Sequence, residues 1–218
     1  MTEQIELLHH LASEPVSIQG RTVFSGFTAA LRDARGATGR DPATGAIVNP
    51  GHTCSWLGAV GYLILLDQIG TCFRPAGTAD VDGNTINHAL SYFTDFSGAD
   101  RIALYALRCT LAHDYSLVNE HPRTHRRTHH FIILSDPDFP VLRHPPQPWN
   151  GDYASQEPDN ATIVNIRAMG ELVEKIYREL LDLAKVSNLE IILPGGMSEL
   201  TSRYGISFQT PIIGRSIG

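Results

Sequence analysis

Arg108 and His113 are the two residues whose types and spacing point most directly to chemistry. Both lie in the stretch 102–117, in which six apolar residues precede Arg108. An arginine carries a planar fork of donors that fits a phosphate group and does not lose its charge. A histidine can accept and donate a proton near neutral pH. The pair therefore indicates chemistry at a phosphodiester, and the first hypothesis is an RNA-cleaving site.

A second interpretation of the same pair is structural. Arginine and histidine are frequent in this chain, and Arg123 and His129 stand at nearly the same spacing. A charged side chain in an apolar helix is costly unless a partner neutralises it. In this interpretation Arg108 pairs with a carboxylate such as Asp114, and His113 is a residue of the helix C-terminus.

Composition limits the classes of protein that fit. The net charge of −6 argues against a protein that coats nucleic acids, but it leaves room for an enzyme with a locally basic cleft. The three cysteines, Cys54, Cys72 and Cys109, are widely spaced in apolar surroundings, which predicts buried free thiols in a reducing compartment.

Neither the N-terminal residues nor the apolar runs indicate a membrane or export segment. Residues 1–6 are acidic and lack the pattern of a signal peptide. The longest apolar run, residues 56–66, is far shorter than the roughly 20 residues that span a bilayer. The sequence therefore predicts a soluble, cytoplasmic protein that does not contact a membrane.

Apolar residues repeat every three or four positions along most of the chain, which predicts helices. The expected helices lie near residues 5–11, 23–34, 54–73, 84–96, 99–117 and 161–186. Two short apolar runs separated by Ser-Asp-Pro-Asp predict a small β-hairpin at 128–143. We expect N-terminal helices and a loop in 1–53, a helical domain in 54–186, and a C-terminal extension in 187–218.

The order of these elements, with Leu-Tyr-Ala-Leu-Arg-Cys-Thr-Leu-Ala-His-Asp at 104–114, resembles the HEPN superfamily. That resemblance covers about residues 54–186. It implies a mainly α fold, a HEPN-like helical bundle with a small β-hairpin insertion between the last two long helices. Many such domains are dimeric, metal-independent ribonucleases of toxin–antitoxin and defence systems. Others are non-catalytic scaffolds or modules that bind a nucleotide or a protein.

The resemblance also implies roles for individual residues. Arg108 and His113 would be the catalytic pair, with the RNA 2′-hydroxyl attacking its own adjacent phosphate and no metal or cofactor taking part. His113 would transfer a proton and Arg108 would stabilise charge on the phosphate. Cys109, Asp114 and Tyr115 would support the pair. Cys109 follows the arginine where the family often has asparagine, a departure that favours the non-catalytic alternative.

Helix geometry adds a constraint on this pair. Five residues place Arg108 and His113 about 140° apart around an ideal helix and about 7.5 Å apart along it. One chain alone would therefore not bring them together. We expect a homodimer in which the 99–117 helices pair and bring two arginines and two histidines to one groove. RNA is the expected ligand, and a cognate antitoxin or another partner protein stays an open alternative.

The segment 121–144 is the most basic part of this acidic chain. Five of its side chains are expected to bind RNA phosphates: Arg123, Arg126, Arg127, His125 and His129. In a second interpretation His125, His129 and His130 bind a metal, although their spacing suits a helix and the segment is typical of a strand. In a third, the segment is a solvated strand whose arginines pair with acidic loops.

Overall fold

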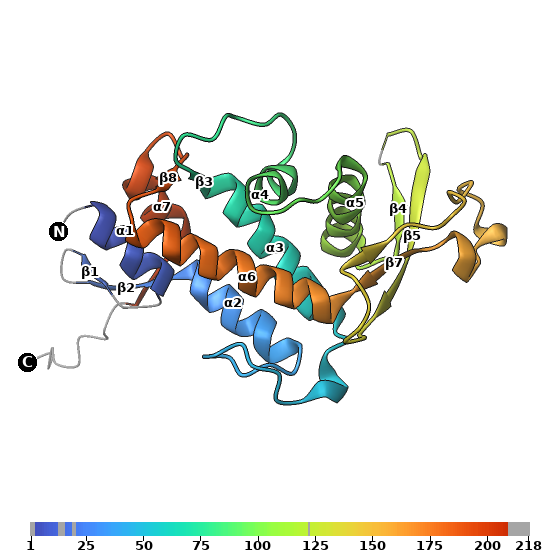
Figure 1. Cartoon of the computed structure of the whole chain (residues 1–218), viewed down its shortest axis with the longest axis horizontal. Coiled ribbons are helices and arrows are strands. Elements are labelled where there is room, and N and C mark those ends of the chain that lie inside the picture. The colour runs from blue at the N-terminus through green and yellow to red at the C-terminus, as the bar shows by residue number, and fades with distance from the viewer. Residues whose placement is uncertain (1–2, 13–15, 19–20, 122, 209–218) are drawn as a thin grey trace, which may run out of the picture.

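The computed structural model describes residues 3–12, 16–18, 21–121 and 123–208. Within them the chain forms seven α-helices and three small β-sheets. The expectation of a mainly α, HEPN-like bundle is therefore wrong, because strands from both ends and from the middle of the chain form sheets at both ends of the helical body (Figure 1).

Five helices precede the four-stranded sheet in the chain, and two follow it. Their bounds are α1 Glu3–Ala12, α2 Gly26–Ala37, α3 Trp56–Cys72, α4 Thr85–Phe93, α5 Gly98–Asp114, α6 Ile166–Lys185 and α7 Gly196–Tyr204. Helices α3, α4 and α5 each begin with a side-chain cap. Ser55, Asn84 and Ser97 accept a hydrogen bond from a backbone amide of the first turn of their helix.

Helix α3 is the centre of the core. It packs against α2, α4, α5 and α6, and Tyr62, Leu65 and Ile69 are fully buried. Gly70 allows α3 to approach α4 closely, because a Cβ atom there would collide with the carbonyl oxygen of Thr85. A helix that is apolar on nearly all sides is typical of a buried element, and α3 accordingly holds the neighbouring helices in place.

A four-stranded sheet lies at one end of the molecule, beside α5 (Figure 1). Its order is β4 Val118–Glu120, β5 Arg127–Leu134, β7 Thr162–Asn165 and β6 Leu142–Arg143. The expected hairpin at 128–143 is wrong, because β7 lies between β5 and β6 and pairs with β5 in parallel. All four residues of β7 are buried, and its Thr-Ile-Val sequence suits a strand inside a sheet.

At the opposite end of the molecule, strands from the two ends of the described chain pair with each other. Strands β1 Val16–Ile18, β2 Arg21–Ser25 and β9 Gly205–Phe208 form one antiparallel sheet. Strands β3 Phe73–Pro75 and β8 Leu189–Ile191 form a two-stranded ribbon. The C-terminal extension, as far as residue 208, therefore folds back on the N-terminal elements (Figure 1).

A buried ion pair anchors the long loop between α2 and α3. Arg35 donates from Nε to Glu174 Oε1 over 2.6 Å and from Nη2 to Glu174 Oε2 over 2.8 Å. Its Nη1 donates to the carbonyl oxygens of Pro42 and Ala43 in the loop. Gly45 of the same loop has a φ of +75° and lies so close to the Glu174 carboxylate that a side chain would clash.

Candidate functional site

Helix α5 carries both residues of the expected catalytic pair. Its start is fixed by a capping box in which Ser97 and Asp100 exchange hydrogen bonds. One side of α5, including Leu104 and Leu107, is fully buried, whereas Ile102 and Tyr105 are exposed on the other side. The helix thus presents an open face to solvent along its whole length.

Arg108 stands at one edge of this open face. Its Nε donates to Asp67 Oδ2 of α3 over 2.5 Å, and Asp67 also accepts a hydrogen bond from the Thr85 hydroxyl. The Arg108 side chain is 29 % exposed. Its Nη1 and Nη2 donate to no described residue. The carboxylate partner that the structural interpretation requires is therefore Asp67, not Asp114, and the guanidinium keeps two nitrogens for a ligand.

His113 stands at the other edge, in the last turn of α5. It is exposed and makes no hydrogen bond or ion pair with the residues that the structure describes. Tyr105, Cys109 and Ala112 occupy the helix surface between it and Arg108. A single chain therefore does not bring the two residues together, as the helix geometry predicts.

The three residues expected to support the pair lie around it. Cys109 is half-buried, and its hydrogen bond with Tyr105 raises the pKa of that tyrosine. Asp114 is exposed at the end of the helix. Tyr115 adopts the left-handed conformation with φ 49° and packs on Trp56, with their ring centroids 5.3 Å apart. Tyr115 is thus the C-cap residue of α5.

Helices α3 and α5 both carry exposed apolar side chains. Leu57 and Ile64 of α3 are 65 % and 45 % exposed, and Ile102 of α5 is 65 % exposed. Ile64 lies one helical turn from Asp67, the residue that joins α3 to α5.

The basic segment separates into paired and unpaired side chains. Glu120 of β4 accepts hydrogen bonds from His125 Nδ1 and from Arg127 Nε, each over 2.7 Å, and these bonds lower the pKa of Glu120. The Arg127 guanidinium also lies 4.1 Å from the ring centre of Tyr153. His125 and Arg127 are therefore largely engaged within the chain.

Arg123 and Arg126 remain available. Both are exposed at the turn between β4 and β5, and their side chains contact no acceptor among the described residues. They are the two members of the expected phosphate-binding set that the structure leaves free.

His144 and Asp100, near His129, are two site residues that the sequence did not single out. His129 Nδ1 lies 3.0 Å from the Thr162 hydroxyl, and burial, with a smaller effect of His144, lowers the pKa of His129. His144 donates from Nε2 to Asp100 Oδ1 over 2.9 Å. Burial alone would raise the pKa of Asp100, but hydrogen bonds from Ser97 and His144 lower it. Because 44 residues separate His144 from Asp100, no local pattern indicates this contact.

The metal interpretation finds no support in the arrangement of the histidines. His130 Nε2 lies 2.5 Å from Asn160 Oδ1 and its ring packs on Trp149, whereas the neighbouring His129 points to the other face of β5. Among the described residues, no three His, Cys, Asp or Glu side chains gather where they could hold a metal ion.

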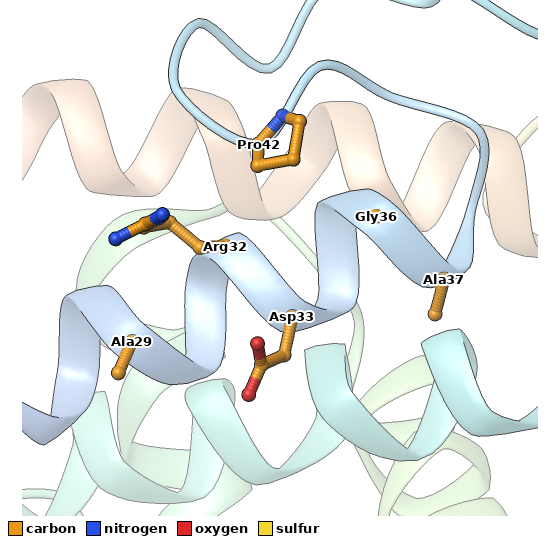
Figure 2. A pocket seen from close by; sticks show the side chains of 6 residues that line it. All are labelled: Ala29, Arg32, Asp33, Gly36, Ala37 and Pro42. Carbon is orange, nitrogen blue, oxygen red and sulfur yellow. The ribbon is translucent and has the colours of Figure 1, made fainter.

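Three cavities of the described surface are lined by no residue of α5. One of about 480 Å³ opens over α2 beneath Pro42, and Figure 2 shows Arg32 and Asp33 in its lining pointing in different directions. Its other lining residues are Ala29, Gly36 and Ala37. Their polar groups do not converge on one point, so this cavity has no catalytic arrangement.

Comparisons with known proteins add no relative. No family model, no curated protein and no solved structure matches the chain. No helix within the described ranges combines the length and apolar character needed to cross a membrane.

Proposed function

We propose that this protein is a metal-independent endoribonuclease that acts as a homodimer in the cytoplasm. The observation that carries the proposal is the open face of α5, with Arg108 at one edge and His113 at the other. Asp67 orients the Arg108 guanidinium but leaves Nη1 and Nη2 without a partner among described residues. These two nitrogens form the edge of the planar fork that binds a phosphate.

In a dimer, the second copy of the chain brings its His113 toward Arg108 of the first copy. A two-fold axis that runs parallel to α5 packs two copies of the helix side by side in the same direction. Because this axis exchanges the two edges of the open face, each Arg108 lies on the same edge of the contact as His113 of the partner subunit, about 7.5 Å from it along the helix axis, and a phosphate held between the two side chains spans that distance. The exposed Ile102 and Tyr105 fill the middle of the contact.

The proposed reaction uses these two groups. His113 of the partner subunit accepts the proton of the RNA 2′-hydroxyl, and the 2′ oxygen forms a bond to the adjacent phosphorus. Arg108 stabilises the negative charge that develops on the phosphoryl oxygens. The bond from phosphorus to the 5′ oxygen breaks, and this oxygen takes a proton from water. The products are a 2′,3′-cyclic phosphate and a 5′-hydroxyl.

One observation favours a second candidate, a dimer that binds RNA without cleaving it. Cys109, at the centre of the open face, is engaged with Tyr105 instead of presenting a polar group beside Arg108. In this candidate Arg108 contacts a phosphate but no proton is transferred, so RNA binds and stays intact.

Incubation with RNA in the presence of a chelator tests the proposal. We expect cleavage to continue and to leave 2′,3′-cyclic phosphate ends, while DNA of the same sequence stays intact because it lacks the attacking hydroxyl. Arg108→Ala should abolish cleavage, whereas Asp67→Asn, which breaks the ion pair but keeps the guanidinium, should retain part of it. Loss of cleavage on chelation, with recovery on adding zinc or magnesium, would contradict the mechanism.

A further inference from the structure

Strand β8 has one edge that no described strand covers. It pairs with β3 alone, with Glu190 opposite Arg74. The ribbon continues at both ends, since Ile192 N–H donates to the Cys72 carbonyl and Ala76 N–H donates to the Asn188 carbonyl. Because backbone groups alternate in direction along a strand, the N–H and C=O groups of Leu189 and Ile191 point away from β3. None of them bonds to a described backbone group.

A groove of about 390 Å³ runs along this strand. The consecutive residues 189–192 form one wall, and Glu3, Gln4 and Leu7 of α1 form the other. These three helix residues lie on one side of α1, because Leu7 is four residues from Glu3 and three from Gln4, and positions three and four residues apart are neighbours on a helix surface. A cavity between a free strand edge and a helix has the shape of sites that take up an extended peptide as an added strand.

A side chain inside the groove lacks a partner. Gln4 Nε2 is buried and donates to no described group. A buried amide without an acceptor is unfavourable, and a peptide carbonyl brought into the groove would satisfy it. This donor is independent of the free backbone groups of β8, and both require the same kind of ligand.

The charges of the groove favour a basic ligand. Glu3 and Glu190 line it, together with Arg74. The Arg74 guanidinium is already engaged, with Nη2 donating to Glu190 over 2.8 Å and Nη1 donating to Asp80. The two carboxylates of the lining thus outweigh its one arginine, so the groove is negative overall.

We propose that the groove between β8 and α1 binds an extended peptide in which basic residues alternate with apolar ones. The peptide adds a third strand to the β3–β8 ribbon, by bonding to the outward backbone groups of Leu189 and Ile191. Its basic side chains lie near Glu3 and Glu190. This site is separate from α5 and does not depend on the proposed ribonuclease activity.

Three synthetic peptides with fluorescent labels test the proposal on the full-length protein: Val-Lys-Val-Lys-Val, Val-Glu-Val-Glu-Val, and the lysine peptide with N-methylated backbone amides. Anisotropy should show saturable binding of the first peptide and much weaker binding of the other two. N-methylation removes the donors that pair with the strand, and the glutamates meet like charge. Hydrogen exchange at the Leu189 and Ile191 amides should slow when the lysine peptide binds.

Variants test the role of the unpaired amide. Gln4→Leu keeps the size of the side chain but removes its donor, and we expect about fivefold weaker binding, the effect of one hydrogen bond. Gln156→Leu changes an exposed glutamine outside the groove and should bind as the natural protein does. Equal affinity for all three peptides, or no saturation by the lysine peptide up to about 1 mM, would overturn the proposal.

Discussion

Acidification should destabilise this protein through His10, well above the pH at which carboxylates titrate. His10 is 6 % exposed, and its Nε2 lies 3.4 Å from the Ser25 hydroxyl. Burial lowers its pKa from 6.5 to about 4. In the unfolded chain the ring regains an ordinary pKa, so the unfolded state binds a proton that the folded state rejects.

The magnitude follows from the difference between the two pKa values. Each unit is worth about 1.4 kcal/mol, so the full effect on the free energy of unfolding is about 3 kcal/mol. Since the folded pKa lies below the unfolded one, this stability is present above pH 6.5 and is lost as the pH falls through about 4. About 2 kcal/mol of it should disappear between pH 7 and pH 5. His129, whose pKa is also lowered, adds a loss of the same sign.

Urea unfolding followed by circular dichroism at pH 7 and pH 5 measures this loss. His10→Leu should remove most of the difference between the two pH values, because the leucine has no proton to gain. His52→Gln removes an exposed histidine and should leave the difference unchanged. If His10→Leu loses as much stability on acidification as the natural protein, the assignment to His10 is wrong.

Two further predictions concern the buried ion pair and the basic turn. Glu174→Gln leaves a buried guanidinium without its counter-charge and should lower the free energy of unfolding by about 3–5 kcal/mol. Glu171→Gln, at a side chain 53 % exposed, should change it by less than about 1 kcal/mol, and equal losses would refute the argument. Arg123→Ser with Arg126→Ser should weaken RNA binding and reduce the slope of log affinity against log salt by about 1.4. Arg178→Ser, at an exposed arginine of α6, should not change that slope, and a slope unaffected by the double change would exclude the turn from the RNA path.

The helices were predictable from local patterns. The expected helices at 54–73, 84–96 and 99–117 correspond to α3, α4 and α5, with ends differing by a few residues. Periodic apolar residues and capping side chains lie within the same segment, so no distant contact is needed to recognise them.

The sheets were not predictable in the same way. The run Thr162–Asn165 continues the apolar pattern of α6, and it was assigned to that helix. Its pairing with β5, whose partner residues lie 31 positions earlier in the chain, makes it a strand. A short apolar run fits both periodicities, and only the distant partner decides between them.

Local patterns also failed to predict the partners of the candidate site residues. The sequence identified Arg108 as a charged residue that needs a partner, but the nearby Asp114 seemed the natural choice. The actual partner, Asp67, lies 41 residues away and reaches Arg108 only because α3 and α5 pack together. His144 and Asp100 were missed for the same reason.

Mixing two inactive variants tests the central claim most directly. The claim is that Arg108 of one subunit acts with His113 of the partner subunit. Arg108→Ala and His113→Ala should each be inactive alone. After the two are unfolded together and refolded at equal amounts, half of the dimers hold one intact composite site, so about a quarter of the natural RNA-cleaving activity should return. No recovery, in a mixture shown by mass spectrometry to contain mixed dimers, would contradict the shared site.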